Sequence, residues 1–147
     1  MADKLNLVLL IDDNEDDNFF HRRAIEKAKA VKSIDVCVDG SDALDYLRNT
    51  GKYLRRGENY PRPDLIFLDI NMPRTNGWEF LDEYALLDKR FVGGPIVVML
   101  TTSLNPVDRQ RAGNCSLVRE FMTKPLKQET FQEILQKHFP AVFSLES

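Results

Sequence analysis

Residues 65–69 read LIFLD, and this stretch decides the fold class because it holds four consecutive apolar residues without polar alternation. Residues 5–11 (LNLVLLI) and 96–100 (IVVML) are nearly as apolar. Strands with water on one face alternate apolar and polar side chains, whereas continuous apolar runs are typical of strands covered on both faces. The three runs therefore predict the centre of a parallel sheet between two layers of helices.

Two further runs, Ile34–Val38 and Val118–Met122, alternate more with polar residues and are predicted nearer the edges of the sheet. Segments with helical spacing follow each of the five runs. The pattern is strand then helix, five times, and right-handed crossovers then place helices on both faces of one sheet. The sequence predicts an α/β fold.

Local signals support the predicted helices. Asn14 with Asp17 three residues later resembles an N-terminal cap, and Asn105-Pro106 resembles a cap followed by proline in the first turn. The helix after Pro106 is weakly amphipathic, since it offers only Val107 and Ala112 as apolar contacts.

The composition fits one globular domain of 147 residues, with 43% hydrophobic and 29% charged residues. A net charge of −3 argues against binding nucleic acid by broad phosphate neutralisation. No apolar run approaches the ~20 residues that span a bilayer, and the start lacks a signal-peptide pattern. Cys37 and Cys115 have no metal-ligand neighbours, which predicts two reduced packing residues and a cytoplasmic location. We expect one domain over residues 1–147, with its core at about 6–139 and a short tail at 140–147.

Polar residues follow four of the predicted strands: Asp12-Asp13, Asp69, Thr101-Thr102 and Lys124-Pro125. In an open parallel sheet, ligands bind at the carboxyl ends of the strands, so these side chains should converge. Gathered carboxylates repel one another unless a cation neutralises them. The donors are hard oxygens with no histidine or cysteine nearby, which favours Mg2+ over a transition metal.

The same set suits phosphoryl transfer. A carboxylate such as Asp69 is a known type of nucleophile, forming an aspartyl phosphate. Thr101 can donate a hydrogen bond to a phosphoryl oxygen, and Lys124 can place a positive charge beside another. Such transfer depends mainly on positioning and charge neutralisation.

Each residue also has an ordinary interpretation. Asp12 and Asp13 are typical helix-capping acids, and Lys124 alone would be a solvated lysine. Phe121, in a strand, is most simply a core residue. His21 and His138 lie on predicted helices without metal-ligand partners, so we expect both at the surface. The joint placement at strand ends, not any single residue, favours the functional interpretation.

The motifs LLIDDN, LIFLDINMPRTNGWEFL, VVMLTTS and FMTKPL occur in this order, and together the chain resembles the receiver domain of two-component response regulators. The resemblance covers about residues 6–139. It implies a flavodoxin-like (βα)5 fold, a doubly wound five-stranded parallel sheet of order 2-1-3-4-5. It also implies a phospho-acceptor switch rather than an enzyme.

The resemblance implies a role for each matching residue. Asp69 would be the phosphorylation site, and Mg2+ would be held by Asp12, Asp13, Asp69 and the backbone carbonyl of Asn71. Thr101 and Lys124 would bind the phosphoryl group, and Phe121 would be the aromatic that moves on phosphorylation. Supporting positions would be Pro125, expected after a cis peptide, and Thr102 and Ser103, which would tune access and phosphoryl lifetime.

The implied partners are a sensor histidine kinase, or a hybrid kinase or phosphotransfer protein, and a downstream protein whose identity stays open. The chain ends soon after its last helix, so we expect no output domain, no direct DNA binding and no membrane contact. The long irregular stretch Thr50–Pro63 is a candidate for partner specificity. The tail residues Phe143 and Leu145 are candidates for docking or for a homodimer. The alternative is a constitutive docking module that is not phosphorylated, with Thr102 closing the site.

Overall fold

The computed structural model describes residues 4–56, 62–72, 75–87, 95–102 and 105–142. Five parallel strands form one sheet in the order β2-β1-β3-β4-β5. This confirms the predicted doubly wound sheet and the edge positions of the second and fifth strands. The strands are β1 (Leu5–Ile11), β2 (Val31–Cys37), β3 (Leu65–Asp69), β4 (Ile96–Thr101) and β5 (Val118–Thr123).

One strand begins earlier than predicted. β2 begins at Val31 rather than Ile34, because the exposed residues Lys32 and Ser33 continue its parallel pairing with β1. Polar residues at the edge of a sheet carry little apolar signal, so the pattern in the sequence missed them.

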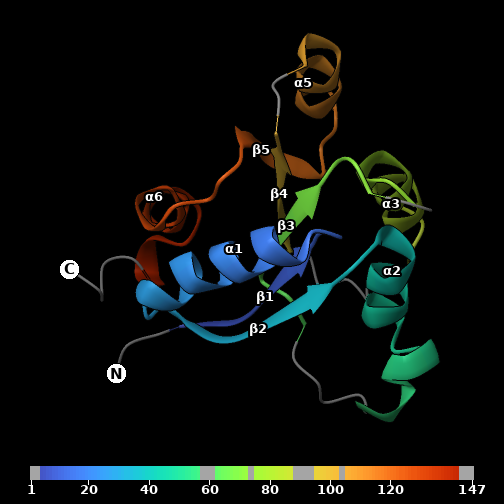
Figure 1. The fold of residues 1–147 in the computed structure, drawn as a ribbon, viewed down its shortest axis with the longest axis horizontal. Coiled ribbons are helices and arrows are strands. Elements are labelled where there is room, and N and C mark those ends of the chain that lie inside the picture. Colours follow the sequence, from blue (N-terminus) through green and yellow to red (C-terminus); the bar gives the residue numbers. More distant parts are fainter. Residues whose placement is uncertain (1–3, 57–61, 73–74, 88–94, 103–104, 143–147) are drawn as a thin grey trace.

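Helices cover both faces of the sheet (Figure 1), and the core divides into two clusters accordingly. The helices are α1 (Glu15–Lys27), α2 (Gly40–Arg48), the 3-10 helix η1 (Gly51–Arg56), α3 (Gly77–Tyr84), α5 (Pro106–Gly113) and α6 (Gln128–His138). One cluster packs α1 and α6 against side chains such as Val8 and Phe67. The other packs α2, α3 and Ala112 of α5 against the alternate side chains of the strands, such as Leu9 and Leu68. No helix among the described residues has both the length and the apolar content needed to cross a bilayer.

α5 is held mainly by polar contacts. Ala112 is its buried residue, whereas Val107, predicted as an apolar contact, is 72% exposed. Trp78 of α3 donates its Nε1–H to Asp108 at 3.1 Å, and the Arg111 guanidinium lies 4.5 Å from the centre of the Trp78 ring. The expectation for Val107 was wrong because these α3 contacts set how α5 is rotated.

The first part of the predicted long loop is folded. Tyr53 in η1 donates its hydroxyl to Asp42 of α2 at 2.7 Å and packs against the core cluster beneath α2. Residues 57–61 lie outside the described residues, as do Phe143 and Leu145. Val142, in the predicted tail, is buried against the α1–α6 cluster.

The turn that follows β3 has no room for a side chain at Gly77. A Cβ there would lie 2.7 Å from the Asp69 carbonyl oxygen and 2.9 Å from the Ile70 Cα. Gly77→Ala must therefore displace the backbone next to Asp69, and we expect a loss of about 2–3 kcal/mol in the free energy of unfolding. Gly113→Ala is the control, because a Cβ there meets nothing within 4 Å. Urea denaturation of both variants checks this, and equal stabilities would contradict it.

Candidate functional site

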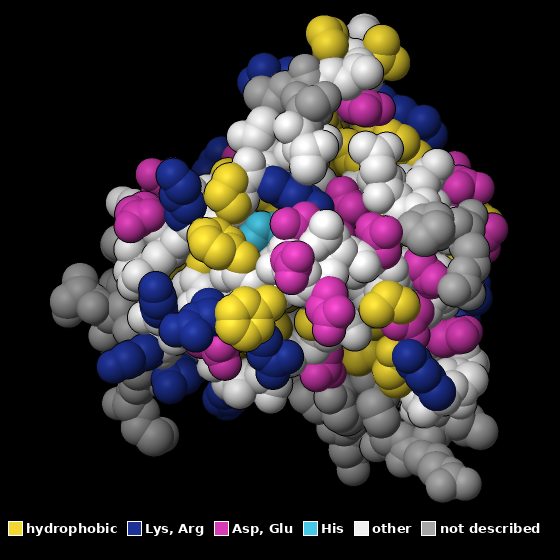
Figure 2. All heavy atoms as spheres, in the orientation of Figure 1, with side chains coloured by type: hydrophobic (Ala, Val, Ile, Leu, Met, Phe, Trp, Pro, Cys, Tyr) yellow, Lys and Arg dark blue, Asp and Glu magenta, His cyan; other side chains and the backbone are white. Residues whose placement is uncertain are grey.

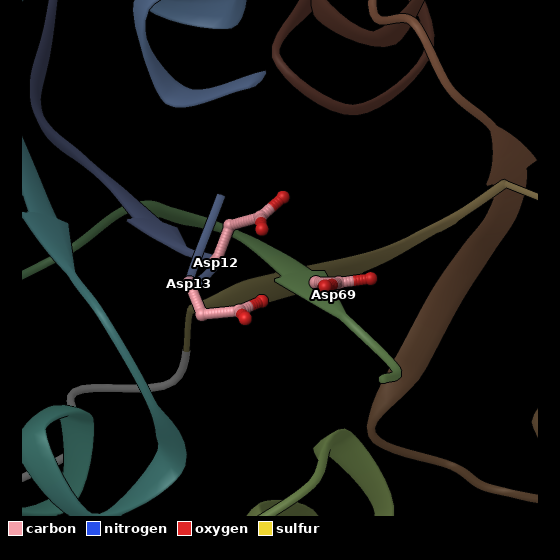
Figure 3. A group of neighbouring side chains, drawn as sticks. All are labelled: Asp12, Asp13 and Asp69. Carbon is pink, nitrogen blue, oxygen red and sulfur yellow. The ribbon is translucent and has the colours of Figure 1, made fainter. Parts of the chain in front are cut away.

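Three carboxylates meet at the carboxyl ends of two neighbouring strands. Asp12 and Asp13 follow β1, Asp69 ends β3, and Ile11 pairs with Leu68 just before them. One carboxylate oxygen from each aspartate lies within 4.8 Å of the others. Figure 3 shows the three side chains extending to the same side of the strand ends. Asp12 and Asp69 are buried and Asp13 is exposed. The predicted convergence of these three residues is confirmed.

The turn between β1 and α1 holds Asp12 in place. The Asn14 backbone N–H donates to Asp12 Oδ1 at 2.9 Å, and Asn18 Nδ2 donates to the Asp12 carbonyl oxygen at 2.8 Å. Asn14 also accepts from the Asp17 backbone N–H at 2.9 Å, which confirms the predicted cap. Figure 2 shows acidic side chains gathered around this end of α1, while lysines and arginines gather toward its other end.

Lys124 reaches into the acidic cluster from the end of β5. Its Nζ donates to Asp12 Oδ2 at 2.7 Å and to Asp17 Oδ2 at 2.8 Å, and it lies 3.6 Å from Asp69 Oδ1. Burial alone would lower the pKa of Lys124, but the hydrogen bonds that it donates to Asp12 and Asp17 raise its pKa to about 12. Its backbone N–H donates to the Thr101 carbonyl oxygen at 2.7 Å, and the Lys124–Pro125 peptide is cis, as expected.

The negative charge of Asp69 is only partly compensated by its neighbours. Burial first, and then the negative charge of Asp12, raises the pKa of Asp69 to about 6, although Lys124 and the Asn71 backbone N–H act in the opposite direction. Carboxylate oxygens held this close without enough positive charge fit a hard divalent cation, which would remove the repulsion. The donor set therefore fits the Mg2+ that the sequence predicted.

The structure describes most of the remaining predicted residues. Thr101 is buried at the end of β4, beside the strand that carries Asp69. Phe121 of β5 is half-buried and packs against the cluster under α2 and α3. Thr102 and Asn71 are exposed. Ser103 lies outside the described residues.

The sequence did not predict the positions of two polar residues near Lys124. Asp17 was interpreted as part of a helix cap, yet its carboxylate also binds Lys124. His21, one helical turn later, was expected at the surface and is only 2% exposed. Its pKa is lowered, first by burial and then by the charge of Lys124. Asp17 and His21 are four residues apart and therefore share one face of the helix, which was the sequence signal that both could face the same neighbours.

The receiver domain model of response regulators matches residues 8–136. The chain belongs to the response regulator receiver family. Receiver domains act as phospho-acceptor switches and bind a divalent metal at an acidic pocket, and in this receiver the pocket is formed by Asp12, Asp13 and Asp69.

Individual relatives agree with this assignment. The response regulator Rcp1 of Synechocystis sp. is 34% identical over 113 residues, which span 74% of this chain and 71% of that protein. Its Mn2+-bound form matches with a TM-score of 0.67 at 29% identity, covering 97% of this chain and 92% of that one. A two-component response regulator from Cytophaga hutchinsonii has a TM-score of 0.78 at 30% identity, with 91% and 96% covered. The phosphorylated cyanobacterial phytochrome response regulator RcpA has a TM-score of 0.70 at 29% identity, with 96% and 91% covered.

Proposed function

We propose that this receiver is a phosphorylatable switch in which Asp69 accepts a phosphoryl group from a sensor histidine kinase, a hybrid kinase or a phosphotransfer protein. The observation that carries the proposal is the position of Asp69, which is grouped with Asp12 and Asp13 and lies 3.6 Å from Lys124 Nζ. The phosphorylated state of the related RcpA and the metal-bound state of the related Rcp1 support it.

Asp69 would act as the nucleophile. One of its carboxylate oxygens forms the new O–P bond while the N–P bond of a phosphohistidine donor breaks, and the imidazole leaves with the electron pair and gains a proton from solvent. A pKa of about 6 leaves Asp69 largely ionised at pH 7.5 and more basic than an ordinary aspartate. Lys124 and the Thr101 hydroxyl would bind phosphoryl oxygens of the product.

We propose Mg2+ as the resident cation, held by the carboxylates of Asp12, Asp13 and Asp69 and by the Asn71 carbonyl oxygen. When bound, Mg2+ would neutralise the carboxylates and attract a phosphoryl oxygen. The burial of Asp12 and the hydrogen bond from the Asn14 backbone N–H to Asp12 Oδ1 would orient its carboxylate for this role.

The signal would leave through a change of surface. A phosphoryl group on Asp69 would draw in Thr101, and Phe121 would move into the space that it leaves. The surface of α5, β5 and α6 would change for a downstream protein, and the sparse apolar packing of α5 supports a movable element. Thr102 and Ser103 would tune access to Asp69 and the lifetime of the phosphoryl group.

Phosphorylation by a small donor tests the proposal directly. We expect incubation with acetyl phosphate and Mg2+ to add one phosphoryl group, detected by intact mass. Asp69→Asn should abolish the adduct because it removes the nucleophile, whereas Asp16→Asn, which removes an exposed charge in the first turn of α1, should not.

Two failures would have different meanings. An adduct that persists in Asp69→Asn would place the acceptor elsewhere. If the unaltered protein gains no adduct and binds no Mg2+ in a calorimetric titration, the alternative of a constitutive docking module is favoured.

A further inference from the structure

The lysine that would bind the phosphoryl group is already occupied in the unphosphorylated protein. Lys124 Nζ donates to Asp12 at 2.7 Å and to Asp17 at 2.8 Å but lies 3.6 Å from Asp69 Oδ1, beyond hydrogen-bond distance. An ammonium group has three hydrogens, so two of them point at carboxylates other than that of Asp69.

Asp17 differs from its acidic neighbours in the first turn of α1. Glu15 and Asp16 are exposed, whereas the Asp17 side chain is 34% exposed and its partner Lys124 is 8% exposed. The Asp17 backbone is fixed by its hydrogen bond to the Asn14 cap. The capped start of α1 therefore places the Asp17 carboxylate within hydrogen-bond distance of Lys124.

Asp12 and Asp17 would respond differently to a bound cation. Under the proposed function Asp12 would help to hold Mg2+, and sharing its carboxylate with the cation would weaken its attraction for Lys124. Asp17 is not among the three clustered carboxylates, so its attraction for Lys124 remains. A phosphoryl group on Asp69 would then have to draw the Lys124 ammonium group toward itself against the attraction of Asp17.

We propose that Asp17 is a positioning residue that holds Lys124 away from the phosphoryl site and so favours the unphosphorylated state. This inference rests on the proposed function of Asp69. The start of α1 would thus restrain the switch through Asp17. A cationic side chain of a partner that docks on α1 and draws Asp17 away from Lys124 would favour phosphorylation.

Binding of beryllofluoride, a mimic of the phosphoryl group, tests the restraint. In Mg2+, Asp17→Asn should raise the apparent affinity for beryllofluoride about 3- to 10-fold over the unaltered protein, because the negative charge that strengthens the hydrogen bond from Lys124 is lost. Asp16→Asn is the matched control, since it removes the same charge one position away, and it should change the affinity less than about twofold. A purely structural role for Asp17 would leave the affinity unchanged or lower it. Equal effects of the two variants, or weaker binding by Asp17→Asn, would overturn the proposal.

A double-mutant cycle separates this inference from the proposed function. The free energy of unfolding is measured without metal for Asp17→Asn, Lys124→Met and the double variant. We expect Asp17→Asn to cost less when Lys124 is already replaced, which shows that the two side chains interact. Without such coupling the restraint is overturned, even if Asp69 is phosphorylated. Coupling together with no binding of beryllofluoride would overturn both the restraint and the proposed function, leaving an ion pair with only a structural role.

Discussion

Replacing Lys124 with methionine is expected to destabilise the metal-free protein by about 3–5 kcal/mol. Lys124 is the cation that bonds to Asp12 and Asp17, and the side chains of Lys124 and Asp12 are 8% and 6% exposed. Methionine keeps the apolar length of the side chain but removes the charge, which leaves Asp12 buried without its ion-pair partner. Urea denaturation in EDTA at pH 7.5 measures the loss.

Lys137→Met is the matched control for this prediction. Lys137 bonds to Glu120 at 3.1 Å, but its side chain is 66% exposed, so its loss should cost less than about 1 kcal/mol. Adding Mg2+ should restore part of the stability of Lys124→Met because the cation replaces some of the missing positive charge. Equal, small losses in both variants would show that the Lys124 cluster is screened by water like a surface pair.

The sequence predicted where most residues of the candidate site lie, because the position of a strand's carboxyl end depends only on the order of residues along the chain. Continuous apolar runs identify strands that are covered on both faces, and parallel strands place their carboxyl ends at one edge. Asp12, Asp13, Asp69 and Thr101 follow or end such a run, Lys124 follows the more polar fifth strand, and the structure places all five at that edge. The same reasoning gave the fold, and the resemblance gave the strand order.

The residues that were missed depend on how helices are rotated against the sheet. Asp17 and His21 look like any polar residues on the outside of a helix, and only the packing of α1 turns them toward Lys124. The prediction that Val107 is an apolar contact was wrong for the opposite reason. With Trp78 hydrogen-bonded to Asp108, α5 is oriented so that Val107 faces water. A helical pattern predicts which residues share a face but not what that face meets.

Replacing Asp69 with asparagine is expected to stabilise the metal-free protein at pH 7.5 by up to about 3 kcal/mol. Folding raises the pKa of this carboxyl from its ordinary value of 3.8 to about 6, and each unit costs the ionised form ~1.4 kcal/mol. Asparagine fits the same space without the charge, so it avoids both the cost of burying a charge and the repulsion from Asp12. Urea denaturation in EDTA measures the gain, and Asp16→Asn, at an exposed position, should change stability by less than about 0.5 kcal/mol.

The pH dependence of this gain identifies its source. Below pH 3.8 Asp69 is protonated in both the folded and unfolded chains, so the two proteins should be equally stable. Between pH 3.8 and about 6 the folded protein holds a proton that the unfolded chain has lost, so its stability relative to Asp69→Asn falls as the pH rises. Above about pH 6 the difference should be constant. His21, whose pKa is lowered by burial, destabilises both proteins as the pH falls, so comparing the two curves removes its contribution. A stability difference that does not change with pH would show that asparagine acts through packing. Mg2+, which neutralises the Asp69 charge, would then not reduce the difference in stability between the two proteins.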